Sequence, residues 1–193
     1  LPIPYSEVDY VLVTHAHIDH VGLLPLIYAR GFRGQIMATR ATCDLCDIML
    51  KDCAHIQESE AEWKNRKAMR AGKPEVTPIY TMNDALHHFV PCNYNEIIRL
   101  NDNLEIRFVD VGHLLGSASI EIWMKEDDCS KKIVFSGDIG NKNKPLIRSP
   151  QYAWANKNQG NAIAAAGSAK VYFIANPSAQ CDALNATNSQ ISD

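Results

Sequence analysis

Three histidines and an aspartate lie within six residues of one another, directly after an apolar run at residues 8–14. They are His15, His17, Asp19 and His20, in the pattern H-x-H-x-D-H. Imidazole nitrogens and carboxylate oxygens are donors that zinc and similar divalent ions accept. Successive side chains of a strand point to opposite faces, so these donors can meet only where the chain leaves a strand and turns. The pattern therefore predicts a metal site on a loop between a strand and a helix.

A solvated polar loop with accidental histidines is the alternative interpretation. The chain has seven histidines in 193 residues, so three of them within six positions would be a rare coincidence. The spacing also differs from H-E-x-x-H, in which two histidines one helical turn apart share a helix face. We therefore favour a loop site, with Asp19 and His20 near the start of an apolar helix that includes residues 23–28.

Two later segments carry further donors at the ends of predicted strands. Residues 104–111 alternate as a strand and run into a glycine-flanked loop with His113, after which residues 119–124 alternate again. Residues 132–135 lead into Asp138, which has glycines on both sides that let other backbone segments approach closely. Each segment alone is weak evidence for a metal site, because a lone histidine is more often a packed or surface residue. In this order after H-x-H-x-D-H, they indicate one site assembled from three loops.

The three segments resemble the motifs of a known fold. T-H-A-H-I-D-H-V-G-L-L-P, G-H-L-L-G-S-A-S and F-S-G-D-I-G are similar to the second, third and fourth motifs of the metallo-β-lactamase fold. The form G-H-x-L-G-S-A, after a helical insert, more closely resembles the β-CASP branch of RNA-processing nucleases, which includes ribonuclease J and the mRNA 3′-end processing endonuclease. The similarity runs from about Tyr5 to about Pro150. It implies an α/β fold, the αββα sandwich of that family.

The resemblance also implies a role for each donor. By the family pattern, His15, His17 and His113 bind a first Zn²⁺, Asp19 and His20 bind a second, and Asp138 bridges the two ions. A shared carboxylate offsets the repulsion between two close cations. A hydroxide held between them would attack phosphorus in RNA, because zinc lowers the pKa of bound water to about 7. We accordingly expect Asp19, His113 and Asp138 to be catalytic.

The sequence departs from the family pattern in three ways. The family opens with strands that carry an acidic motif, whereas only fourteen residues precede His15 here, so we expect a sandwich that is incomplete at the N-terminus. The family has a β-CASP domain after S-G-D, and we expect this chain to lack it. No histidine follows His113, although the family supplies one to the second metal from its C-terminal end. We therefore expect the second ion to lack a ligand, one or both ions to be lost, and the isolated chain to be weakly active.

Composition suggests the domain organisation. Residues 1–150 are expected to form a partial metallo-β-lactamase-like domain, with a helical insert at about 40–90 whose charged residues form a solvated face. Residues 151–193 hold few charges and are rich in Ala, Asn, Ser and Gly, which is typical of sequence that buries little and orders poorly. We expect a divergent tail in which residues 170–175 could form one strand.

The cysteines and the remaining histidines receive structural interpretations. Cys43 and Cys46 have C-x-x-C spacing, but the other four cysteines are singletons, so a structural zinc site would lack its second pair. We expect reduced thiols, as in a reducing compartment, and hence a cytoplasmic protein. His55, His87 and His88 are interpreted as surface or strand-face residues.

Charge and hydropathy limit the partners. The formal net charge is −3 and the basic residues are scattered, which argues weakly against nucleic acid, so RNA as a partner rests on the family resemblance. Lys142, Lys144 and Arg148 form the one basic group near the predicted site, and a solvated loop is the alternative reading. No run approaches the roughly 18 apolar residues of a membrane span. We expect no membrane partner and allow for a homodimer.

Three functions stay open at this point. The leading one is a metal-dependent RNA phosphodiesterase. A metallo-β-lactamase-fold hydrolase of a small ester, thioester or lactam would share every ligand through Asp138, and a non-catalytic module with a partial metal site is the third. Zinc content, measured together with cleavage of single-stranded RNA and of a chromogenic ester, distinguishes them.

Overall fold

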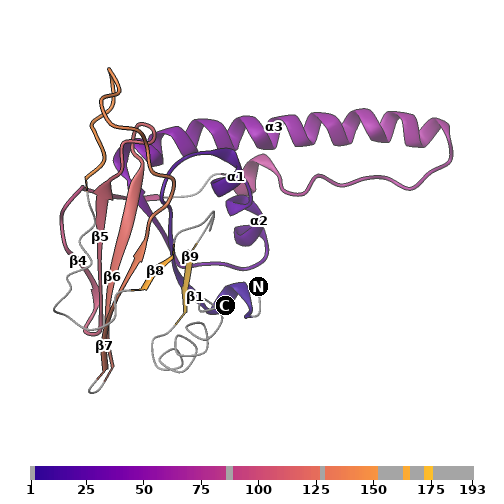
Figure 1. Ribbon diagram of the computed structural model, residues 1–193. Coiled ribbons are helices and arrows are strands. Elements are labelled where there is room, and N and C mark those ends of the chain that lie inside the picture. The colour runs from indigo at the N-terminus through magenta and orange to yellow at the C-terminus, as the bar shows by residue number, and fades with distance from the viewer. Residues whose placement is uncertain (1–2, 86–88, 127–128, 152–162, 166–171, 176–193) are drawn as a thin grey trace, which may run out of the picture.

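Two β-sheets pack face to face, and helices cover the outer face of the first sheet (Figure 1). The computed structural model describes residues 3–85, 89–126, 129–151, 163–165 and 172–175. The first sheet has the strand order β3-β2-β1-β9 and consists of β1 (Val8–Leu12), β2 (Gln35–Thr39), β3 (Phe89–Cys92) and β9 (Tyr172–Ala175). Strands β1, β2 and β3 run parallel, whereas β9 is antiparallel to β1.

The second sheet is mainly antiparallel. Its order is β4-β5-β6-β7-β8, with β4 (Ile98–Asn101), β5 (Leu104–Asp110), β6 (Ala118–Glu126), β7 (Cys129–Phe135) and β8 (Ile163–Ala165). Neighbours up to β7 are antiparallel, and β8 is parallel to β7. The alternating sequence explains the sheet, because every second side chain faces the same side. Ile106, Ile122 and Ile133 lie side by side in the register and are buried.

The core has two layers that share the first sheet. Leu12 and Met37 point from that sheet toward Phe108 and Ile120 of the second, and all four are buried in one cluster. The alternate residues of β1 and β2 face the other way, where they pack against helices α1 (Ile18–Val21), α2 (Leu24–Ala29) and α3 (Arg40–Arg70). Because successive side chains of a strand point to opposite faces, the first sheet has one apolar face toward the second sheet and another toward the helices.

Helix α3 is long and projects past the sheets (Figure 1). It spans 31 residues, and Thr39 caps its start by accepting a hydrogen bond from the Thr42 backbone N–H. Small and apolar side chains recur on the face that meets the body, with Cys46, Leu50 and Ala54 fully buried. The segment after α3 returns alongside it to a short helix, α4 (Met82–Ala85).

The structure confirms the predicted fold class and most of the predicted elements. The fold is α/β, and the described residues supply a helix layer and both sheets of the αββα sandwich; none of the described helices covers the outer face of the second sheet. The helix expected after the H-x-H-x-D-H loop is two short helices, α1 and α2, because the backbone leaves the helical conformation at Leu23, with φ −101° and ψ 3°. Residues 86–88, including His87 and His88, lie outside the described residues.

The tail contributes two described strands. β9 lies within the segment in which a strand was expected, at its residues 172–175. β8 was not expected, because its Ala-rich sequence carries no strand signal. Among the described residues, no helix combines the length and the apolar character that crossing a bilayer requires.

Candidate metal centre

The first group of predicted ligands follows the end of β1. Residues 13–17 have no regular secondary structure and bend at Thr14 before the chain enters α1, and His15 in this segment is fully buried. His17 is the residue that precedes α1, while Asp19 and His20 lie in its single turn. His20 is buried, whereas His17 and Asp19 reach the surface. The predicted change from strand to helix therefore places these four side chains around one point.

His113 and Asp138 come from two loops of the second sheet. His113 lies between β5 and β6, where the Ser117 hydroxyl accepts hydrogen bonds from the backbone N–H groups of His113 (3.0 Å) and Leu114 (3.2 Å). Asp138 follows β7. The preceding Gly137 has a φ of +56°, and a Cβ there would lie 2.9 Å from the Thr14 Cβ, so only glycine lets this loop approach the histidine loop.

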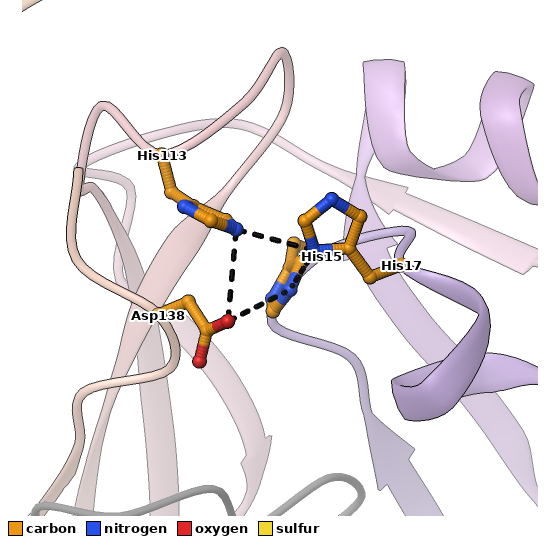
Figure 2. Close-up of side chains that lie close together, drawn as sticks. All are labelled: His15, His17, His113 and Asp138. Atoms are coloured by element: carbon orange, nitrogen blue, oxygen red, sulfur yellow. Dashed lines mark hydrogen bonds and ion pairs between the residues drawn. The ribbon is translucent and has the colours of Figure 1, made fainter.

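Four of the predicted ligands point at one another (Figure 2). His17 Nδ1 lies 3.1 Å from His15 Nε2 and 3.2 Å from His113 Nε2. Asp138 Oδ2 lies 3.6 Å from His113 Nε2 and 3.7 Å from His15 Nε2. The four ligand atoms are within 4.8 Å of one another. Segments separated by about a hundred residues in sequence thus meet at one point.

The other two predicted ligands lie at the edge of this group. His20 Nε2 is 3.8 Å from Asp138 Oδ2 and 3.8 Å from Asp19 Oδ2, and its ring centroid lies 4.0 Å from that of His15 with the ring planes tilted by 50°. Within the described part of the chain, the buried Nδ1 of His20 has no hydrogen-bond partner. The structure therefore brings all six predicted residues together, with Asp138 between the two sets.

The donor geometry fits a divalent cation. Two nitrogens bound to one tetrahedral zinc ion lie about 3.3 Å apart, because each Zn–N bond is about 2.05 Å long. The two nitrogen pairs here are 3.1 and 3.2 Å apart. Hydrogen bonding alone explains such a group poorly, since His17 Nδ1 faces two other ring nitrogens and can share one proton with only one of them.

Burial prepares two of the histidines for metal binding. Burial, together with the nearby His20, lowers the pKa of His15 to about 4. Burial and the neighbouring His17 also lower the pKa of His113. Metal ligation requires the neutral imidazole, so at neutral pH a cation has no proton to displace from these rings.

Supporting contacts around the ligands were not foreseen from the sequence. Thr14 Oγ1 lies 3.0 Å from His15 Nδ1, and in the tautomer whose Nδ1–H donates to this hydroxyl the Nε2 lone pair is directed at the other ligands. Lys144, expected only as part of a basic group, donates a hydrogen bond to the His113 carbonyl at 3.1 Å. The position of Thr14 beside His15 was the only available signal, and it does not by itself specify a contact.

The remaining candidates lie elsewhere. His55 is exposed on α3, in agreement with its expected surface role. The cysteines that the structure describes are all free thiols, and within those ranges none joins a metal-binding group. Burial raises the pKa of Cys43 to about 11 and that of Cys46 to about 12, so both thiols are protonated at neutral pH.

Sequence comparisons with known proteins relate this chain to a family. The profile of the Metallo-beta-lactamase superfamily matches residues 6–175, beyond the residue near 150 at which the resemblance was expected to end. Ribonuclease TTHA0252 of Thermus thermophilus is 37% identical over 145 residues, which cover 75% of this chain and 29% of that protein. Transcription termination factor FttA of Methanosarcina mazei is 30% identical over 135 residues, which cover 70% of this chain and 19% of that protein. Integrator complex subunit 11 of Danio rerio is 29% identical over 150 residues, which cover 77% of this chain and 22% of that protein.

Among solved structures, metallo-β-lactamases align with part of this chain. Rm3 metallo-beta-lactamase aligns with a TM-score of 0.41 at 13% identity, over 74% of this chain and 45% of that one. Metallo-beta-lactamase SMB-1 bound to 2-mercaptoethanesulfonate aligns with a TM-score of 0.43 at 17% identity, over 76% of this chain and 49% of that one. The chain spans less than a third of the curated relatives named above. Since the family profile covers most of its length, this chain belongs to the metallo-β-lactamase superfamily.

Proposed function

We propose that this chain carries the metal centre of an RNA phosphodiesterase of the β-CASP branch. The observation that supports this most is the convergence of His15, His17, His113 and Asp138, whose ligand atoms lie within 4.8 Å of one another. The superfamily match makes a metal the expected occupant of such a group. A relative named as a ribonuclease, 37% identical over most of this chain, supports RNA as the substrate.

The proposed metal content is two zinc ions. His15, His17 and His113 would hold the first ion, Asp19 and His20 would hold the second, and Asp138 would contact both. Bound zinc supplies a water of lowered pKa as nucleophile and positive charge against the phosphoryl oxygens. Asp138 is suited to the shared position, because Oδ2 lies between 3.6 and 3.8 Å from the Nε2 atoms of three histidines, His15, His20 and His113.

The chain's own residues would bind and orient the RNA backbone. Lys142, Lys144 and Arg148 lie on the loop that follows Asp138. Lys144 also donates a hydrogen bond to the His113 carbonyl. Their charge would meet the phosphates on either side of the scissile bond. The net charge of −3 makes this local group and the cations the main attraction for RNA. A cytoplasmic location fits the reduced thiols and this substrate.

Metal content and cleavage, measured on the same preparations, test the proposal. The zinc of the wild-type chain is measured by plasma mass spectrometry, and the protein is then offered a single-stranded RNA and a chromogenic ester. Two zinc ions with RNA cleavage support the proposal. Ester turnover alone indicates a small-molecule hydrolase, and bound zinc without either activity indicates a non-catalytic module.

Two ligand variants test the assignment itself. His17→Ala should lose the first ion, because His17 Nδ1 is the atom that faces both other nitrogens, and Asp138→Ala should lose both ions. His55→Ala is the matched control, since His55 is an exposed histidine on α3 that faces none of these groups. Unchanged zinc content in either ligand variant would contradict the assignment.

A further inference from the structure

The outward face of α3 carries an exposed apolar row that the proposed hydrolysis does not use. Leu45, Ile48, Ile56 and Trp63 are 36%, 71%, 48% and 51% exposed. With Asp52 and Ser59, which are also exposed, they recur at spacings of three and four residues along the helix. This spacing places them in one stripe along a helix. The stripe from Leu45 to Trp63 is about 27 Å long at about 1.5 Å per residue.

The opposite side of α3 is already in contact with the rest of the chain. Cys46, Leu50 and Ala54 pack against the body, and farther along the helix the returning segment binds it through Asn65, whose side chain exchanges two hydrogen bonds with the Val76 backbone. The exposed stripe therefore belongs to the face that neither the body nor the returning segment covers.

Charge is divided unevenly along the same helix. From residue 64 to residue 70 every charged residue is basic, whereas from 44 to 62 every charged residue except Lys51 is acidic. Two such helices laid antiparallel bring each basic end onto the acidic part of the other. Laid parallel, they would place like charges beside each other. The charge pattern is thus self-complementary in one direction only.

We propose that the exposed face of α3 is a docking surface for a second copy of this chain, which pairs with it as an antiparallel helix around a two-fold axis near Ile56. In that register Ile48 faces Trp63 of the second copy, and Ile56 faces itself. Asp44 would lie beside Arg66 of the second copy, and Lys51 beside Glu62 of the second copy. An isologous interface of this kind repeats each contact twice.

RNA is a less suitable occupant of this surface. Trp63 could in principle stack on a base, and Lys67 Nζ lies 3.5 Å from its ring centroid. However, Glu60 and Glu62 lie within one turn of that ring and would repel phosphates. The apolar side chains nearer the start of the helix, Leu45 and Ile48, offer neither a charge nor a hydrogen-bond donor to a phosphate. The proposal does not depend on the proposed hydrolysis, because none of the predicted metal ligands is in the interface.

Sedimentation velocity on the whole chain tests the surface. We expect a dimer at micromolar concentration, and monomers for Ile56→Asp and Trp63→Glu, each with wild-type circular dichroism and zinc content. Ile97→Asp is the control, because Ile97 is a comparably exposed (57%) apolar residue outside α3, and it should remain dimeric. A wild-type chain that is monomeric at 100 times that concentration would overturn the proposal, as would a dimer unaffected by both α3 variants.

A charge reversal within one chain tests the direction of pairing. Asp44→Arg and Arg66→Glu should each weaken dimerisation about tenfold or more, because each places like charges together twice per dimer. The double variant Asp44→Arg/Arg66→Glu should recover most of the affinity. A parallel pair would not recover, since residue 44 would then face residue 44. Failure of the double variant to recover, or a loss of RNA binding by Arg66→Glu with dimerisation unchanged, overturns the proposal.

Discussion

At the scale of single residues, the Thr14 hydroxyl is positioned to orient the ring of His15. Thr14 is buried, and its hydroxyl is the group that faces His15 Nδ1, at 3.0 Å. A partner on the distal nitrogen fixes both the tautomer and the ring orientation of a metal-binding histidine. The side chain of Thr14 therefore has a chemical role, although the sequence offered only its position beside His15.

Replacing the Thr14 hydroxyl should weaken metal binding without unfolding the protein. Thr14→Val keeps the shape of the side chain but removes the hydrogen-bond partner of His15 Nδ1, and zinc affinity should fall about 10- to 100-fold. Competition with a chromogenic zinc chelator measures this. Thr14→Ser, which retains a hydroxyl, should stay close to wild type. Equal zinc affinities in the valine and serine variants would remove Thr14 from the account.

The buried thiol of Cys46 predicts a loss of stability in alkali. Burial raises the pKa of Cys46 to about 12 from an ordinary value of 9.0. Between these values the unfolded chain loses the thiol proton and the folded chain keeps it, so the free energy of unfolding falls as the pH rises. Cys46→Ala should make this fall less steep by up to about 1.4 kcal/mol per pH unit. Urea denaturation at pH 9 to 11 is the measurement, and equal slopes for the two proteins would contradict it.

At the scale of elements, the start of α3 is attached to the loop that carries His113. The hydroxyls of Thr39 and Thr42 both donate to the Gly116 carbonyl, at 2.6 and 2.9 Å. Gly116 has a φ of +86°, and a Cβ there would lie 2.6 Å from the Thr42 nitrogen, so the close approach requires glycine. The helix thereby holds the His113 loop in place.

Removing one of these hydroxyls should lower stability. Thr42→Val leaves a buried carbonyl with one partner fewer, and the free energy of unfolding should drop by about 1–3 kcal/mol. Chemical denaturation measures the drop. Thr77→Val is the control, because it makes the same substitution at an exposed threonine in the segment after α3, and its effect should stay within about 0.5 kcal/mol. A Thr42→Val protein as stable as the control would show that the contact is dispensable.

Local sequence patterns predicted the elements better than their contacts. Strands β5, β6 and β7 and helix α3 follow from alternation and helical spacing, which are properties of neighbouring residues. The Ala-rich β8 does not, because its hydrogen bonds come from β7, about thirty residues earlier. The contact of Thr42 with Gly116 is likewise set by the tertiary fold. The candidate ligands stood out in the sequence because such clustered histidines are unusual, whereas the hydroxyls beside them belong to common residue types.

At the scale of the whole molecule, the inner core between the sheets holds the three ligand loops in one place. Phe108 is fully buried in that core, where it lies in the cluster that includes Leu12 and Ile120. Because both sheets contribute to the cluster, loss of packing there should separate loops that come from different sheets.

A cavity in this core should therefore affect stability and metal binding together. Phe108→Ala should lower the free energy of unfolding by about 3–5 kcal/mol. Urea denaturation with and without zinc measures the loss, and the stabilisation that added zinc provides should shrink with it. Leu146→Ala is the control, since Leu146 is 96% exposed and should change stability by less than about 0.5 kcal/mol. Full zinc stabilisation in the Phe108 variant would mean that the centre forms independently of this core.

Anomalous diffraction from zinc-soaked crystals tests the metal centre most directly. We expect a peak at the zinc edge about 2.0–2.2 Å from His15 Nε2, His17 Nδ1 and His113 Nε2, with Asp138 as a further ligand. A second peak on the side of Asp19 and His20 would support the two-ion arrangement. A peak at any other place in the molecule, with these three nitrogens left without a metal, would contradict the account.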